Sequence, residues 1–250
     1  MKHKIITFGE LMLRLSPDNN ERFTQAHSYE AVYGGGEANT AVSLANFNVD
    51  TRYVTKLPKH TIGQSAVNSL RQYGVDVSRI VRGGDQIGIY FLEKKTSQRP
   101  TNVIYNRNGS AFALATKEDF DWDSIFDGAT WFHFSGITPA ISDNMAEITI
   151  EACKEAKKRG ITVSCDLNYR SKLWSSEKAN KVMSEVCRYV DICIANEDDA
   201  VGIFGMDASK SDKEKNAYIA EELTKMFPNF KMVALSLIHI SEPTRLRCIS

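Results

Sequence analysis

The chain has 250 residues, 42% of them hydrophobic and 25% charged, which is enough for one sizeable α/β domain. Lysine plus arginine and aspartate plus glutamate each total 31, so overall charge favours neither nucleic acid nor an acidic membrane surface as a partner. The five cysteines form no C-x-x-C pair and no zinc-like spacing, and the apolar start is too short for a signal peptide or membrane span. We therefore expect a cytoplasmic protein with reduced thiols and no bound structural metal.

Two kinds of pattern alternate along the chain. Residues 4–9 form an apolar run that predicts a first buried strand. Within about 11–33 and 83–107, apolar and polar side chains alternate, which predicts antiparallel strands of a small separate sheet. Elsewhere strand and helix patterns alternate, which predicts an α/β fold with a mostly parallel sheet and helices on both faces. The expected strands of that sheet are 4–9, 51–57, 132–136, 161–166, 191–195 and 232–234, with helices after 36 and at 62–73, 144–158, 178–187 and 213–227.

Residues 34–39, G-G-G-E-A-N, run directly into a helical pattern. Glycines allow backbone N–H groups to approach a ligand closely, and a helix start favours oxygen-rich groups. A dinucleotide fingerprint is disfavoured because Asn39 occupies the place of its third glycine and residues 29–33 do not resemble a buried strand. A simple turn that caps a helix remains open from these residues alone.

Polar residues follow several expected strands, where ligands bind in parallel sheets: 9–10, 136–138, 166–170 and 196–199. Arg107 and Arg170 each follow a strand and a tyrosine, and a guanidinium can bind a carboxylate through two hydrogen bonds. An arginine stacked on its neighbouring ring at the surface is an equally open interpretation.

Further candidates also have structural explanations. Tyr90 and Tyr105 could be ordinary outward aromatics of a half-exposed sheet. Asn196 and Asp199 could cap a helix or help to organise hydrated Mg²⁺ near phosphates. His133, within an aromatic strand, is expected to be a hydrogen-bonded core residue, and no G-x-x-x-x-G-K-[ST] phosphate loop is present.

Six motifs appear in order: G-G-G-E-A-N-x-A-V-S-L-A, I-G-I-Y-F-L, Y-x-R, S-G-I-T-P-A, C-D-L-N-Y-R-x-x-L-W and N-E-D-D-A. Together they resemble the ribokinase-like (phosphofructokinase-B-type) carbohydrate kinases, and most closely their 2-keto-3-deoxygluconate kinase branch. The resemblance covers residues 4 to about 234. It implies that the small sheet is a lid that closes over the sugar and often contributes to a dimer contact.

The resemblance also implies which residues touch the ligands. The glycine loop would meet the sugar hydroxyls, the lid would supply aromatic side chains, and two arginines would face the substrate's carboxylate. Residues after two strands would border the ATP phosphates, where N-E-D-D resembles a family N-x-x-E element that helps to hold Mg²⁺. The implied substrate residues are Gly34, Gly35, Asn39, Tyr90, Tyr105, Arg107 and Arg170. The implied cofactor residues are Asn168, Tyr169, Arg170, Asn196 and Asp199.

The implied reaction transfers the γ-phosphoryl group of ATP to the primary hydroxyl of 2-keto-3-deoxygluconate. In the family, the carboxylate base and the anion hole come from a G-A-G-D element, which is absent from residues 1–250. We therefore expect no catalytic base in this chain and no kinase activity. The alternatives are a non-catalytic sugar-acid-binding module, a ribokinase or fructokinase, and, least favoured, a dinucleotide-dependent oxidoreductase.

From Leu235 the sequence departs from the family and reads L-S-L-I-H-I-S-E-P-T-R-L-R-C-I-S. This string resembles translated sequencing-adapter DNA. We therefore expect residues 1–234 to be an incomplete ribokinase-like domain that lacks the C-terminal part of the fold, and residues 235–250 to be a non-native tail.

Overall fold

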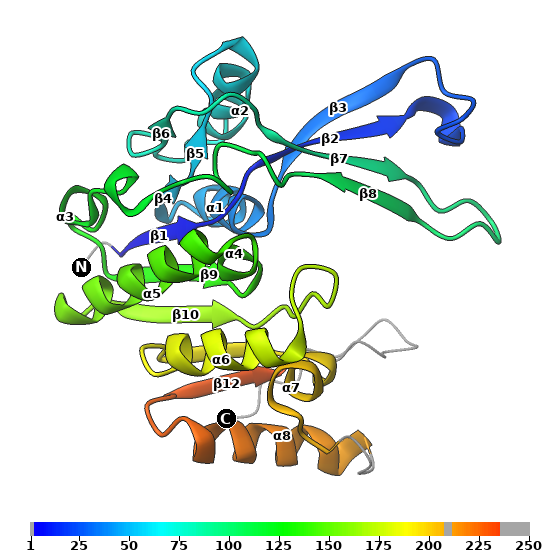
Figure 1. Cartoon of the computed structure of the whole chain (residues 1–250). Helices are drawn as coiled ribbons and strands as arrows, with labels where there is room; N and C mark the ends of the chain where they lie inside the picture. Colours follow the sequence, from blue (N-terminus) through cyan, green and yellow to red (C-terminus); the bar gives the residue numbers. More distant parts are fainter. Residues whose placement is uncertain (1–2, 208–211, 236–250) are drawn as a thin grey trace.

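The computed structural model describes residues 3–207 and 212–235. Its central sheet has six strands in the order β12-β11-β10-β9-β1-β4, all parallel to their neighbours (Figure 1). The predicted mostly parallel α/β fold is confirmed. The strands of this core sheet are β1 (Lys4–Phe8), β4 (Asp50–Val54), β9 (Trp131–Ser135), β10 (Thr162–Asp166), β11 (Ile192–Ala195) and β12 (Met232–Leu235).

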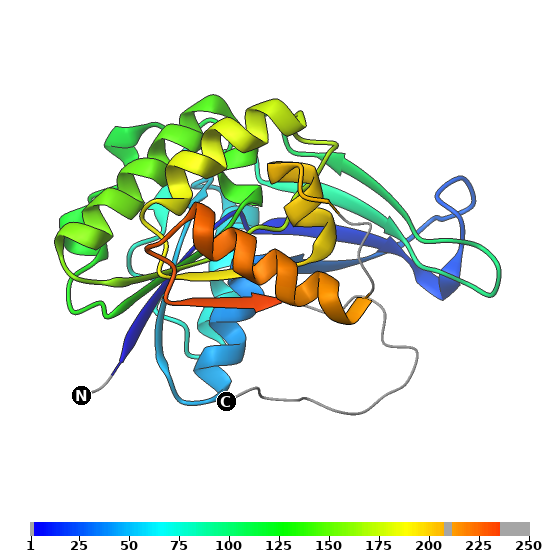
Figure 2. The ribbon, with the colours of Figure 1, turned by 90° about the horizontal axis from the view of Figure 1, so that it is seen from below.

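Helices cover both faces of the core sheet. In α5 (Asp143–Lys158), Met145, Ile148 and Ala152 repeat at helical spacing on the buried face, and the Ser142 hydroxyl caps the start by accepting from the amide of Met145. Figure 2 shows α5 and α6 on one side of the sheet and α1 on the other. The remaining helices are α1 (Gly36–Asn46), α2 (Thr61–Arg71), α3 (Trp122–Ile125), α4 (Ile137–Ala140), α6 (Ser176–Cys187), α7 (Glu197–Phe204), α8 (Asp212–Met226) and the short 3-10 turns η1 (Asp18–Asn20) and η2 (Lys117–Asp119).

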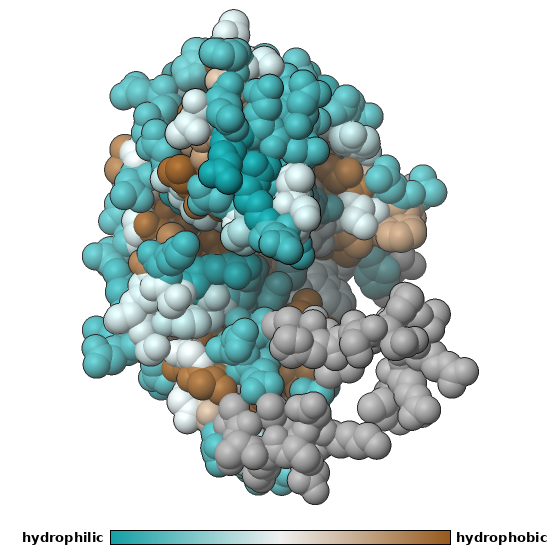
Figure 3. All heavy atoms as spheres, turned by 90° about the vertical axis from the view of Figure 1, so that its right-hand side faces the viewer, coloured by the Kyte–Doolittle hydropathy of each residue, from teal (hydrophilic) through white to brown (hydrophobic). Residues whose placement is uncertain are grey.

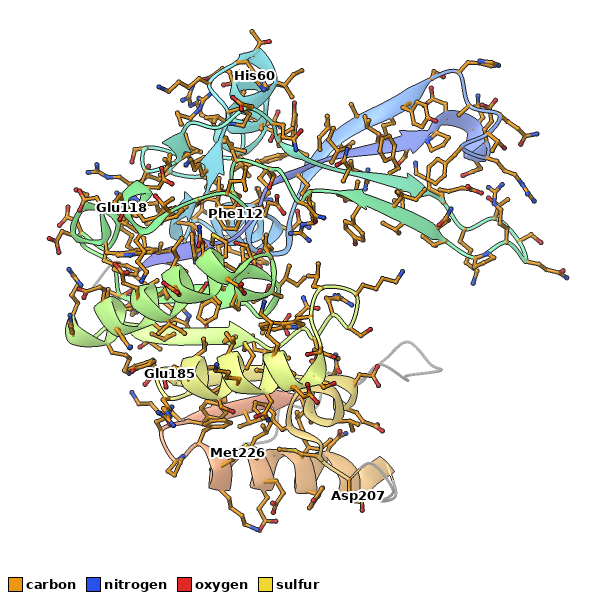
Figure 4. All side chains as sticks on the ribbon, viewed as in Figure 1. His60, Phe112, Glu118, Glu185, Asp207 and Met226 are labelled. Atoms are coloured by element: carbon orange, nitrogen blue, oxygen red, sulfur yellow. The ribbon has the colours of Figure 1, made fainter. Side chains whose placement is uncertain are left out.

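Aromatic rings fill the larger core cluster, between the core sheet and α5. Phe8 is completely buried, and its ring centroid lies 5.2 to 6.3 Å from those of Phe112, Phe120, Trp122 and Phe132. Figure 4 shows Phe112 in the interior of the body. A smaller cluster that includes Leu11, Tyr53 and Leu70 lies beneath α1 and α2.

A second sheet projects from the body (Figure 1). It contains β3 (Tyr29–Gly34), β2 (Met12–Pro17), β7 (Gly88–Glu93) and β8 (Asn102–Asn106), in the order β3-β2-β7-β8. Its outer pairs are antiparallel, but the central pair β2·β7 is parallel. The expectation of antiparallel pairing is therefore wrong for the central pair, because β2 and β7 both start at the body and run outward. A short parallel pair, β5 (Lys56–Leu57) and β6 (Val81–Arg82), lies near α2.

The stretch before the glycines forms β3, although residues 29–33 do not resemble a buried strand in sequence. Residues 29–31 are exposed, and β3 is the outer strand of the second sheet, antiparallel to β2. A dinucleotide fingerprint needs a strand of the buried parallel sheet at this place. The dinucleotide interpretation therefore has no structural support, even though a strand is present.

Within the described residues, no helix is long and apolar enough to cross a membrane. Leu235, the first residue of the expected non-native tail, is the last residue of β12 and pairs with Ala195. The rest of the expected tail, 236–250, lies outside the described residues.

Candidate functional site

The carboxyl ends of the parallel strands meet at one edge of the core sheet, beside the base of the second sheet. Residues 9–10 follow β1, Gly136 follows β9, and Asn168 and Asn196 follow β10 and β11. Seen from the side of the second sheet, the surface is set back between this sheet and the body below it (Figure 3). The topology therefore brings most of the residues suspected from the sequence to one place.

The glycine loop forms one wall of the candidate site at the carboxyl ends of the strands. A side chain at Gly35 would overlap the backbone carbonyl of Glu10, so only glycine fits there. A Cβ at Gly34 would lie 3.8 Å from the Tyr90 hydroxyl and 3.9 Å from Asn39 Oδ1. The Tyr90 hydroxyl and the Asn39 amide thus face the same side of Gly34, and the structure brings these three residues together.

Tyr90 and Tyr105 occupy one face of the second sheet. They pair across β7 and β8, and their rings stack with centroids 5.8 Å apart. Tyr105 remains 53% exposed. Arg107 follows two residues later, on the same face by strand alternation, with its guanidinium carbon 5.9 Å from the centre of the Tyr105 ring.

Arg107 is buried and bound to Glu10. Its Nε donates to Glu10 Oε2 at 2.7 Å, and its Nη2 forms an ion pair with the same oxygen. Burial raises the pKa of Glu10, although Arg107 and Ser110 oppose the rise. Two of the three guanidinium nitrogens are thus turned toward Glu10, so a ligand carboxylate would meet Nη1. Glu10 is among the polar residues expected here from its place after β1, but its sequence context assigns it no role.

Glu37, in the first turn of α1, is a second buried carboxylate near Arg107. It accepts from the Ser135 amide at 3.0 Å and from the Ser135 hydroxyl at 2.5 Å, and its carboxyl group lies against Gly9. Burial raises its pKa. The sequence gave no signal for this role, because an acidic residue at a helix start is usually exposed and favoured by the helix dipole.

Beyond β10 and β11, a third group of residues is tied together. Asp199 is 2% exposed and accepts from the amides of Tyr169 and Asn196, at 2.6 and 2.9 Å. The Asn196 side chain accepts in turn from the Asp199 amide, which completes a capping box at α7. The capping explanation for Asn196 and Asp199 is therefore realised, and a ligand role for them stays a prediction.

Asp166 and Arg170 complete this group. Burial raises the pKa of Asp166 to about 6, with smaller contributions from the nearby negative charges of Asp199 and Glu37, while Arg170 opposes the rise. Arg170 itself is exposed, and Asn168 between them adopts a left-handed backbone conformation with φ 39°. The Tyr169 ring packs against Gly202, and its hydroxyl lies 3.1 Å from that of Ser176, so Tyr169 has a packing role here.

His133 lies outside the candidate site. Its Nδ1 lies 2.8 Å from the Ser164 hydroxyl, which also accepts from the Trp131 indole at 2.7 Å. Burial lowers the pKa of His133 to about 4, so it is neutral near pH 7. Within the described residues, no group of three or more histidine, cysteine, aspartate or glutamate side chains could hold a metal ion.

Comparison with known proteins defines the class of the chain. The profile of the pfkB family carbohydrate kinases matches residues 2–233. The chain belongs to this family, and the fold is the ribokinase-like fold of its structural neighbours.

Individual relatives show which kinases of the family the chain resembles. A 2-dehydro-3-deoxygalactonokinase from Haloferax volcanii is 37% identical over 209 residues, which are 83% of this chain and 65% of that protein. The crystal structure of a 2-dehydro-3-deoxygluconokinase from Thermotoga maritima is 49% identical, with a TM-score of 0.91 over 95% of this chain and 72% of that one. A sugar kinase from Pyrococcus horikoshii solved with ATP shares the fold at 24% identity, with a TM-score of 0.72 over 80% of this chain and 66% of that one. The chain thus spans about two thirds of the length of these relatives.

Proposed function

We propose that the whole protein is a sugar-acid kinase that transfers the γ-phosphoryl group of ATP to the primary hydroxyl of 2-keto-3-deoxygluconate, also called 2-dehydro-3-deoxygluconate. The observation that carries the proposal is the convergence of a glycine wall, two stacked tyrosines and an arginine at one end of the core sheet. Relatives named for kinases of 2-dehydro-3-deoxy sugar acids support the substrate class. The second sheet would act as the lid.

The sugar acid would lie between the second sheet and the glycine loop. Gly34, Gly35 and Asn39 offer backbone and amide groups to hydroxyls, and Tyr90 and Tyr105 offer phenol groups and ring faces. Arg107, through Nη1, and the exposed Arg170 would bind the carboxylate. Two cations suit an acid better than the neutral sugar of a ribokinase or fructokinase, because a buried carboxylate needs charge-assisted hydrogen bonds.

The residues around Asp166 suit the phosphate end. Mg²⁺ typically keeps several waters and binds through one or two carboxylates together with substrate phosphates. The lack of a three-ligand cluster among the described residues fits such a site, and Asp166 and Asp199 supply two neighbouring carboxylates. Asn168, Tyr169, Arg170, Asn196 and Asp199 would border the phosphates of ATP. When bound, ATP supplies the phosphoryl group and Mg²⁺ neutralises its charge.

Binding and catalysis are separate parts of the proposal. With no G-A-G-D element in residues 1–250, we assign no base to this chain and expect it to bind the sugar acid without turning it over. ADP release that depends on ATP and sugar acid should appear only with the whole protein. A whole protein that binds the acid but releases no ADP would support the alternative of a non-catalytic binding module.

The substrate class is tested first by calorimetry of the 250-residue chain with 2-keto-3-deoxygluconate. Arg170→Ala should weaken binding by about tenfold or more, since a hydrogen bond to a charged group contributes about 1.5–3 kcal/mol. The matched control is Arg188→Ala, which removes an exposed arginine from the end of α6. Equal affinity of wild type and Arg170→Ala would refute the carboxylate role, and equal affinity for fructose would favour a fructokinase.

We also propose a cytoplasmic homo-oligomer that associates through the second sheet. The face opposite the tyrosines carries Leu15, Ala31, Phe91 and Ile104 in one cross-strand row, and Ile104 is 50% exposed. Such an apolar surface is typical of an interface between subunits. Sedimentation of wild type and Ile104→Glu tests this, since only the wild type should form the larger species.

A further inference from the structure

We propose that Glu10 is a positioning residue that aims Arg107 at the carboxylate of the sugar acid. The inference rests on the proposed function and adds a residue to it. Glu10 would not touch the ligand. It would act through the guanidinium that it holds, at the joint between the core sheet and the second sheet.

The place of Glu10 in the chain supports this role. It lies in the short link between β1 and β2, where the chain passes from the core sheet into the second sheet. Its carboxylate accepts from Arg107 and from the Ser110 hydroxyl, at 2.7 and 2.5 Å, and both donors lie where the chain returns after β8. One buried side chain thus holds the outgoing and the returning segments together.

Gly88, at the start of β7, packs closely against the Glu10 carboxylate. A Cβ at Gly88 would lie 2.6 Å from Glu10 Oε1, too close for any side chain larger than glycine to fit without movement. The Ser110 hydroxyl that donates to Glu10 also accepts from the Ala113 amide at 3.1 Å, which fixes its direction. Glu10 is 4% exposed, so water does not compete strongly for these contacts. The carboxylate is therefore held on several sides.

Arg107 has a second carboxylate within reach of its charge. Glu37 is buried and feels the positive charge of Arg107, but its hydrogen bonds go to Ser135. With Glu10 in place, Nε and Nη2 turn toward Glu10 and Nη1 is left for a ligand. Without the Glu10 charge, attraction to Glu37 would draw the guanidinium away from this direction.

A positioning role for Glu10 and a purely electrostatic role predict opposite changes in the affinity for the sugar acid when the Glu10 charge is removed. If only the local charge mattered, removal of the Glu10 charge would strengthen the attraction between Arg107 and an incoming anion. If Glu10 aims Arg107, the same change weakens binding, because a guanidinium binds a carboxylate well only in the correct plane. The direction of the change in affinity therefore distinguishes the two.

The test compares Glu10→Gln with wild type by calorimetry, using 2-keto-3-deoxygluconate and its neutral carboxamide as ligands. We expect the affinity for the acid to fall about tenfold, the size of one lost charged hydrogen bond, while the affinity for the carboxamide stays within twofold. In an Arg107→Gln background, Glu10→Gln should cause no further loss. The matched control is Glu93→Gln, which removes a second Glu–Arg pair of the same sheet, with Arg99 at its outer end.

Gly88→Ala is the second variant, because it displaces the carboxylate without removing it, and it should show the same selective loss. If Glu10→Gln does not fold by circular dichroism, Gly88→Ala carries the test. Unchanged or tighter binding of the acid by these variants, or equal losses for both ligands, would overturn the positioning role while wild-type binding upholds the proposed substrate. Failure of the wild type to bind the acid would overturn the proposed substrate itself.

Discussion

The core sheet and the second sheet are built on different principles. The core sheet is covered by helices on both faces, and Phe8, Phe132 and Phe134 within it are completely buried. The second sheet is half exposed over most of its length, with open outer strands β3 and β8 (Figure 4). Burial of apolar area on both faces therefore stabilises the first. The second is joined to the body only at its base, where Leu13, Tyr33 and Ile89 pack against the smaller hydrophobic cluster and Glu10 binds Arg107 and Ser110. Stability thus comes mainly from the core sheet, whereas the second sheet carries side chains that we propose bind the ligand.

Phe8→Ala, in the core sheet, should cause the largest loss of unfolding free energy. The variant removes a completely buried ring that contacts four other aromatic rings, and such a change typically costs about 3–5 kcal/mol of unfolding free energy. Urea unfolding followed by tryptophan fluorescence measures it. A cost below about 1 kcal/mol would mean that the core sheet is not the main source of stability.

Phe91→Ala should have a smaller effect. Phe91 is half buried in the second sheet and makes edge contacts with Phe23 and Tyr29, at centroid distances of 6.3 and 6.5 Å. We expect the unfolding free energy to fall by about 1 kcal/mol, with faster hydrogen exchange confined to β2, β3, β7 and β8. Faster exchange throughout the core sheet would show that the two sheets unfold as one unit and do not differ in the source of their stability.

Asp166→Asn should stabilise the protein, by no more than Phe91→Ala costs, and the size of the gain depends on pH. The unfolded carboxyl titrates near its ordinary pKa of 3.8, whereas burial raises the pKa in the folded protein to about 6. The folded state is therefore penalised progressively as pH rises between these values, and fully above pH 6. Asparagine carries no charge, so the variant should match wild type near pH 3 and be more stable at pH 7 by on the order of 1 kcal/mol, after allowance for screening by solvent.

Urea unfolding at pH 3, 5 and 7 checks this dependence. Asp127→Asn, at an exposed position, is the control for replacing an aspartate as such. A constant difference between Asp166→Asn and wild type at all three pH values would exclude titration of Asp166 as the cause. A gain in stability at pH 7 would show that this carboxylate at the carboxyl end of β10 is kept at a cost in folding energy.

Most of the fold could be predicted from periodicity. The apolar runs that became β1, β9 and β10 and the helical stripe of α5 are local patterns, which a sequence displays directly. The parallel pairing of β2 with β7 joins residues about 75 positions apart, such as Leu13 and Ile89, and no local pattern specifies it. The short helices α3 and α4 were also missed, since four residues are too few to show a helical period.

The candidate site was less accessible to sequence reasoning. Gly34, Asn39 and Tyr90 were named, and they do lie together. The burial of Glu10 and Glu37 was not foreseen, because charged residues are usually exposed and only the tertiary fold supplies the partners that allow their burial. The ion pair of Arg107 with Glu10 spans 97 positions and has no sequence signature.

The inner position of β1 has a consequence for synthesis of the protein. Strand β1, which leaves the ribosome before the other described strands, has β4 on one side and β9 on the other, and Ile5 pairs with Thr51 and with Trp131. At roughly 5–20 residues per second, several seconds pass between the emergence of β1 and that of β9. During that interval one edge of an apolar strand has no neighbour, and the nascent chain is most open to chaperone binding. The β2–β3 pair, whose partners lie much closer in sequence, can form long before the core sheet is completed.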